Sequence, residues 1–81
     1  MKTEGSGRQR IKYTRHARRR MKWRGISERE IKETLEMPDR RESCGEKRIN
    51  AFKSLGRKLI KVSYVVEDET IVIISVVDKN A

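Results

Sequence analysis

The only proline of the chain, Pro38, separates a helical sequence pattern from a strand pattern. Before it, residues 15–37 carry helix-capping residues and apolar side chains at helical spacing. After it, residues 48–55 and 58–66 alternate between polar and apolar side chains, and residues 70–77 are β-branched and apolar on both faces, as in a central strand. A chain of 81 residues forms one domain of at most two packed layers. The sequence therefore predicts an α+β fold.

Two short helices are expected before the proline. The first covers about residues 15–24, with Thr14 as its N-cap and Gly25 as its C-cap. The second begins after Ser27, whose spacing to Glu30 is that of a capping box. Because the two helices meet at a tight glycine turn, we expect them to form an αα-hairpin.

The other segments complete an expected order of β-α-α-β-β-β. Residues 9–13 are predicted to form a short edge strand, and the polar residues 39–47 a loop or a ragged strand start. The short connections between the later strands favour an antiparallel meander, with the helical hairpin packed on one face of the sheet. Residues 1–8 contain three small residues, Gly5-Ser6-Gly7, and are expected to be a flexible leader. The single domain is then residues 9–81.

The excess of positive charge over negative charge is confined to one segment of the chain. The formal net charge is +9, and residues 5–27 hold nine basic and no acidic residues. The other residues hold twelve basic and twelve acidic side chains. This asymmetry indicates a nucleic-acid ligand or an acidic partner, and the alternative is a solvated basic face without a specific ligand.

The basic side chains of the first helix are not equivalent on a helical wheel. Ala17 and Met21 lie one turn apart and must face the sheet. Four basic residues cluster on the outward side and are expected to contact a nucleic-acid backbone or water: Arg15, Arg18, Arg19 and Lys22.

Arg20, Arg24 and His16 lie at the border of the buried face. An arginine held rigid there matches two oxygens of a phosphate with its planar fork, and a histidine gives or takes a proton near neutral pH. The structural alternatives are a hydrogen bond from His16 to its surroundings, and arginine pairs with acidic residues of the second helix, namely Glu30, Glu33 and Glu36. Trp23 lies beside His16 and Arg20, and we interpret it as a packing residue rather than a base-stacking one. Tyr13 and Tyr64 are interpreted in the same way.

Several classes of protein are excluded by what the sequence lacks. Cys44 is the only cysteine, so it forms no internal disulfide, and no Cys, His or acidic set has the spacing of metal ligands. No signal peptide is visible, and no apolar run approaches the ~18 residues of a membrane span. We expect a cytoplasmic protein without a cofactor, a metal or a membrane partner.

The helical segment resembles a signature of small bacterial and archaeal domains of unknown function. The matching residues read HA..RM..RGIS..EI...L..P, from His16-Ala17 through Arg20-Met21 and Arg24-Gly25-Ile26-Ser27 to Glu30-Ile31, Leu35 and Pro38. With the later strands, the resemblance covers about residues 11–78. This family is grouped with the RelE/ParE-like toxins of type II toxin–antitoxin systems.

The resemblance implies two helices followed by an antiparallel sheet, and it implies a toxin-like RNA-binding protein. Many such toxins are ribonucleases that cut mRNA, often on the ribosome, whereas others poison DNA gyrase or have no known activity. The implied partners are RNA and an acidic antitoxin. RelE-type ribonucleases carry their catalytic basic residues largely on the sheet and near the C-terminus, where residues 77–81 here contain no Arg, His or Tyr.

The candidate catalytic residues are therefore His16 and Arg20. In a metal-independent cleavage His16 would act as acid or base, and Arg20, helped by Arg24, would stabilise the phosphorane. Tyr64 and Lys58 are candidates for a second proton transfer. The alternative is a non-catalytic module that binds nucleic acid or an acidic protein.

Overall fold

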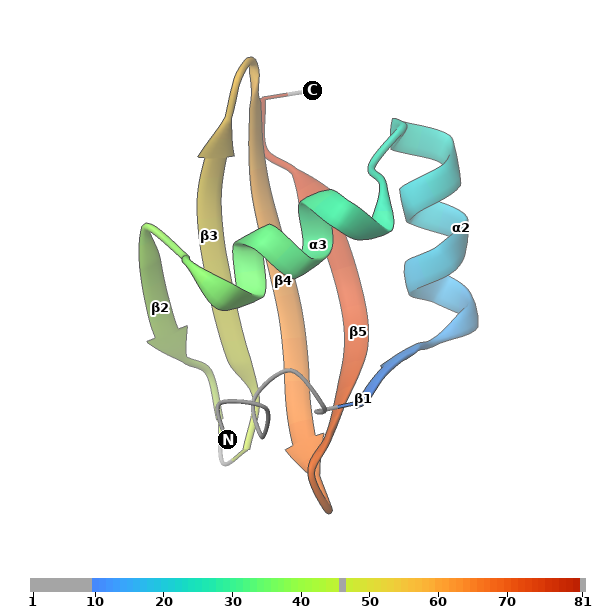
Figure 1. The fold of residues 1–81 in the computed structure, drawn as a ribbon, viewed down its shortest axis with the longest axis vertical. Helices are drawn as coiled ribbons and strands as arrows, with labels where there is room; N and C mark the ends of the chain where they lie inside the picture. The colour runs from blue at the N-terminus through green and yellow to red at the C-terminus, as the bar shows by residue number, and fades with distance from the viewer. Residues whose placement is uncertain (1–9, 46, 81) are drawn as a thin grey trace, which may run out of the picture.

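The computed structural model describes residues 10–45 and 47–80, which form two helices and a five-stranded sheet (Figure 1). The predicted leader at residues 1–8 lies outside the described residues. The α+β class is confirmed. In chain order the elements are β1 (Arg10–Tyr13), α2 (Arg15–Arg24), α3 (Glu28–Glu36), β2 (Arg40–Ser43), β3 (Ile49–Leu55), β4 (Lys58–Glu67) and β5 (Thr70–Asp78).

Both helices begin at the predicted residues, and α2 also ends where predicted, because local capping bonds determine these ends. The Thr14 hydroxyl accepts the Ala17 N–H at 3.1 Å, and Gly25 ends α2 with a left-handed φ of 67°. The Glu30 N–H donates to the Ser27 hydroxyl at 3.1 Å, and the Ser27 N–H donates back to the Glu30 carboxylate at 2.9 Å. The capping box is confirmed.

The predicted αα-hairpin is wrong. In Figure 1, α3 crosses β3 and β4, whereas α2 lies beside β5. Ile26, in the turn between the helices, is buried in the core and directs the chain towards the sheet. Each helix therefore packs on its own strands rather than along the other helix.

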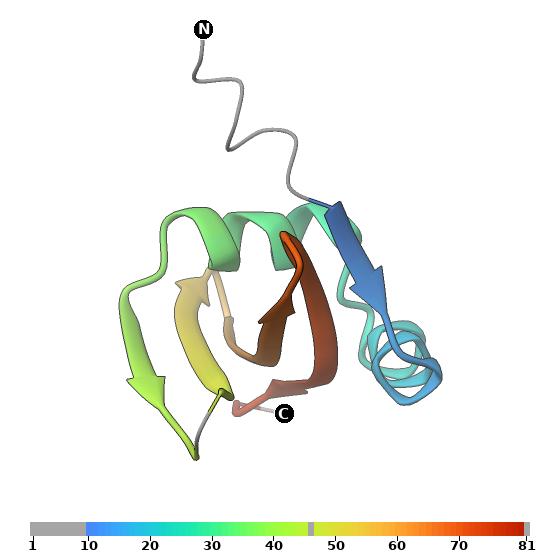
Figure 2. The ribbon, with the colours of Figure 1, turned by 90° about the horizontal axis from the view of Figure 1, so that it is seen from below.

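The sheet is mixed, so the predicted antiparallel sheet is wrong at one edge. Its order is β1-β5-β4-β3-β2, and β1 pairs in parallel with β5, with Ile11 opposite Ile71. The polar segment 39–47 contains an additional strand, β2, which pairs antiparallel with β3. The observed order is thus β-α-α-β-β-β-β. Figure 2 shows β1 and β2 at opposite edges of the curved sheet.

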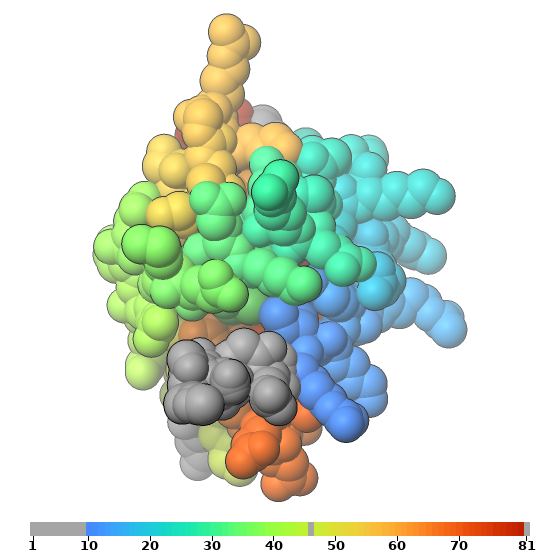
Figure 3. Space-filling model, viewed as in Figure 1, coloured from blue at the N-terminus to red at the C-terminus, as the bar shows by residue number. Residues whose placement is uncertain are grey.

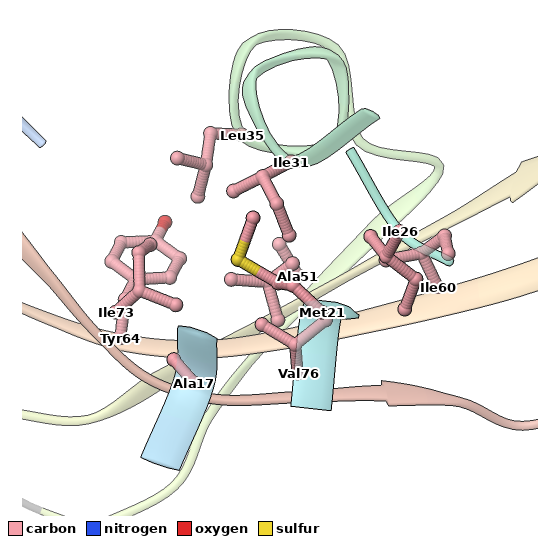
Figure 4. Close-up of a cluster of buried hydrophobic side chains, with 11 residues drawn as sticks. Ala17, Met21, Ile26, Ile31, Leu35, Ala51, Ile60, Tyr64, Ile73 and Val76 are labelled. Carbon is pink, nitrogen blue, oxygen red and sulfur yellow. The ribbon is translucent and has the colours of Figure 1, made fainter. Parts of the chain in front are cut away.

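One buried cluster joins both helices to the sheet (Figure 4). Ala51, Val62 and Val76 form a row across β3, β4 and β5, because they are paired in register. The helices cover this row with four apolar residues, namely Ala17, Met21, Ile31 and Leu35. On the opposite face of the sheet, the Ser63 hydroxyl donates to the Asn50 side chain at 2.6 Å in a buried cross-strand bond.

Candidate nucleic-acid interface

The helix α2 buries only a narrow stripe. Ala17 and Met21 are 0% and 6% exposed, and the side chains on the rest of the helix lie outside the core. In Figure 3 the side chains of this segment project away from the body of the molecule. All four residues predicted to point outward are exposed, as expected: Arg15, Arg18, Arg19 and Lys22.

Arg18 differs from the other outward residues because it has partners. Its guanidinium carbon lies 4.7 Å from the centre of the Tyr13 ring, and its Nη1 is 3.2 Å from the Glu28 carboxylate. Arg18 therefore links α2 to β1 and to the start of α3. Within residues 10–45 and 47–80, no salt bridge engages the other three outward cations, Arg15, Arg19 and Lys22. These three form the uncompensated cationic face of α2.

Tyr13 packs against the core, as predicted. Its hydroxyl is buried and has no hydrogen-bond partner among the described residues. Burial raises the pKa of Tyr13, the nearby Glu28 carboxylate raises it further, and Arg18 acts in the opposite direction. The Tyr13 side chain therefore stays protonated and neutral, and the Arg18 guanidinium stacks on its ring.

The interpretation of Trp23 as a packing residue is wrong, because its side chain is 71% exposed. The buried stripe of α2 is too narrow to include it. The guanidinium carbons of Arg20 and Arg24 lie over its indole ring, 5.8 Å and 5.2 Å from the ring centre. Neither arginine forms a salt bridge with a described residue, so the alternative of pairs with glutamates of α3 is not realised. On the helical wheel Trp23 lies between the outward and the buried sides, so the wheel alone does not decide whether its side chain packs or is exposed.

His16 is exposed in the first turn of α2, and Arg20 is half-buried one turn further on. Residues four apart on a helix are neighbours on its surface, with about 6 Å between their Cβ atoms. Among the hydrogen bonds of the described residues none involves the His16 side chain. His16, Arg20 and Trp23 thus share one stripe of the helix.

The two candidates for a second proton transfer lie elsewhere. Lys58 donates to the Gly25 carbonyl at 2.7 Å and to both Glu30 carboxylate oxygens at 3.1 Å. It therefore fastens β4 to the turn between the helices. Tyr64 is 6% exposed and packs in the core (Figure 4). The structure does not bring either residue together with His16.

Neither a metal centre nor a membrane span is visible in the part of the chain that the structure describes. No group of three His, Cys, Asp or Glu side chains there is placed to hold a metal ion. Likewise, none of its helices is long and apolar enough to cross a membrane.

Residues 13–78 match the family model described as a domain of unknown function, DUF4258, and the chain therefore belongs to this family. The expected membership in a family of small domains of unknown function is confirmed. The match covers both helices and β2 to β5. No curated protein and no solved structure matches the chain.

Proposed function

We propose that this protein binds RNA through α2. The observation that carries the proposal is the uncompensated cationic face formed by Arg15, Arg19 and Lys22. Exposed cations without acidic partners attract a phosphate backbone and release its counterions. Arg20 and Arg24, free of acidic partners among the described residues, offer planar forks for phosphate oxygens beside this face.

The resemblance to RelE/ParE-like toxins supports RNA as the polyanion. In that resemblance two helices precede the main strands, as they do in this chain. We further propose that the protein is the toxin of a toxin–antitoxin pair. An acidic antitoxin segment would then cover the same face of α2 and compete with RNA.

A metal-independent ribonuclease is the second candidate function. It is favoured by His16 and Arg20, which lie one turn apart on the accessible side of α2. In this reaction His16 takes the proton of the RNA 2′-hydroxyl, and Arg20 stabilises the charge that develops on the phosphorus oxygens. Because Lys58 and Tyr64 are engaged elsewhere, the leaving oxygen would take its proton from water.

The binding proposal is tested by the salt dependence of RNA affinity. We expect the variant with Arg15, Arg19 and Lys22 all replaced by Gln to bind RNA more weakly. The slope of log K against log[salt] is negative, and its magnitude should decrease by about 2 to 3, because each of the three lost phosphate contacts removes ~0.7 to 0.9. The matched control replaces Arg29 and Lys32 of α3, which are exposed cations beside glutamates, and should keep the slope. Equal slopes in all three proteins, or no binding of RNA at low salt, would overturn the proposal.

The ribonuclease candidate needs a separate readout. A labelled transcript is incubated with the protein in the presence of a chelator, alone and on translating ribosomes, next to His16→Asn. Cleavage that is lost in the variant while RNA affinity persists supports the activity. Binding without cleavage in both settings leaves the protein as a binding module.

A further inference from the structure

Among the Phe, Trp and Tyr side chains of the chain, all four of which the structure describes, Trp23 is the largely exposed one. Phe52 and Tyr64 are buried, Tyr13 is half-buried, and Trp23 keeps 71% of its surface accessible even with Arg20 and Arg24 beside it. A tryptophan side chain is on average largely buried in a folded protein. Its exposure on the helix that carries the excess charge therefore calls for a ligand with a flat apolar surface.

The surroundings of the indole are cationic. Arg20 and Arg24 lie 5.8 Å and 5.2 Å from the ring centre, within the range of cation–π attraction. Arg19, from the uncompensated cationic face, lies one turn before Trp23 on the same helix. A ligand that stacks on the indole would thus place its phosphates among three arginines. Proteins that bind single-stranded nucleic acids combine these two features, a stacking aromatic ring and a positive track for the backbone.

Two other uses of Trp23 fit the surface less well. Insertion into a membrane needs an apolar helix face, but the other apolar side chains of α2, Ala17 and Met21, are buried against the sheet. Packing on an apolar patch of a protein partner would leave the neighbouring arginines without partners. A duplex is disfavoured too, because its bases are stacked on one another and present no free face.

We infer that Trp23 stacks on an unpaired base, so that the ligand of α2 is single-stranded RNA. This inference rests on the proposed function, which it narrows from RNA in general to RNA with accessible base faces. Arg20 and Arg24, which lie next to the indole, bind the phosphates beside the stacked base.

The test compares a single-stranded RNA with the same strand annealed to its complement, at one salt concentration. We expect the protein to prefer the single strand. Trp23→Ala should lower the affinity for the single strand by about 5- to 150-fold, the usual effect of one stacked base, and leave the affinity for the duplex unchanged. Trp23→Phe should retain part of the affinity, and circular dichroism should show that both variants are folded. The control is Met37→Ala, because Met37 is equally exposed at the end of the other helix.

Fluorescence gives a second readout, because Trp23 is the only tryptophan. Its emission should be quenched by the single strand and not by the duplex. If a polyglutamate peptide quenched the emission as strongly as the single strand does, the inference would be overturned in favour of an acidic protein partner. The inference would be overturned if the protein bound both RNA forms equally and Trp23→Ala either had no effect or lowered the affinity for both forms by the same factor. That result would leave the proposed function intact. No binding of either RNA form would instead remove the proposed function.

Discussion

At the scale of single residues, the ion pair between Glu30 and Lys58 attaches the beginning of α3 to β4. Burial of the Glu30 carboxyl raises its pKa, but hydrogen bonds from the Ser27 N–H and from Lys58 outweigh this effect and hold the pKa below its ordinary value. The charged form is therefore favoured in the folded state. Glu30 thus contributes stability above the pKa that it has in the unfolded chain, and this contribution is lost as the pH falls through the lower pKa of the folded state.

Replacing Glu30 by Gln should remove this contribution and keep the capping box, because the amide oxygen still accepts the Ser27 N–H. We expect a loss of about 1 kcal/mol near neutral pH, the range of a hydrogen bond to a charged group that is partly exposed. The difference from the unmodified protein should shrink as the pH falls below the ordinary pKa of a glutamate and vanish below the lower pKa of the folded state. Urea unfolding at several pH values measures it, and Lys58→Met should show the same pH dependence. A difference that persists at acid pH would contradict the prediction.

The residues that the sequence could predict are those whose partners are close in the chain. Thr14 and Gly25 end α2 through bonds within four residues, so their roles follow from residue type and spacing. The exposed state of Trp23 depends instead on how far the sheet extends under α2. The ion pair of Lys58 joins residues 28 positions apart, and nothing in the local pattern indicates it.

At the scale of elements, Thr14 joins α2 to the irregular part of β5. Its hydroxyl accepts the Ala17 N–H and donates to the Ile74 carbonyl at 3.2 Å. Ile74 is the additional residue of a bulge, because Ile73 is opposite Tyr64 and Ser75 is opposite Ser63. One side chain thus caps the helix and satisfies a carbonyl at the bulge.

Thr14→Ala should therefore cost more than the loss of an ordinary cap. We expect about 2 kcal/mol, the upper end of the range for N-caps, because the Ile74 carbonyl also loses a partner. Thr14→Ser keeps both bonds and should retain most of the stability. Thermal unfolding gives the free energies, and hydrogen exchange should show faster exchange in α2 of the alanine variant. If the two variants were equally destabilised, the hydroxyl would not be the cause.

The elements that were predicted incorrectly are those whose pairing is long-range. β2 reads RRES and has no apolar alternation, so it becomes a strand only because β3 supplies its partner. β1 pairs with β5, which lies far from it in the sequence, and the parallel direction of β1 follows from this long-range pairing rather than from its own residues. The three long strands, β3, β4 and β5, were recognisable because each carries a buried apolar row.

At the scale of the whole molecule, the separation of charge opposes stability while it favours binding. Six cations stand on the ten residues of α2 without one acidic residue. Several lie at helical spacing, such as Arg15 with Arg19 and Arg19 with Lys22, and like charges three or four residues apart destabilise a helix by roughly 0.2 to 0.5 kcal/mol per pair. The helix nevertheless forms, because Ala17 and Met21 pack in the core and both helix ends are capped. Repulsion between the cations lowers the free energy of unfolding, and a bound polyanion would offset this loss.

Arg19→Gln should consequently stabilise the protein and weaken the binding of RNA. Glutamine has nearly the helix propensity of arginine, so the change reports on charge alone. We expect a gain of about 0.5 to 1 kcal/mol at low salt from relief of the pairs with Arg15 and Lys22. High salt should abolish the gain, because exposed charges are screened. Arg29→Gln is the matched control, since Arg29 lies four residues before Glu33 on α3 and its loss should destabilise slightly. Thermal unfolding at low and high salt checks both variants.

A gain in stability for Arg19→Gln that did not depend on salt would contradict charge repulsion as its origin. A loss of stability would show that Arg19 has a structural role.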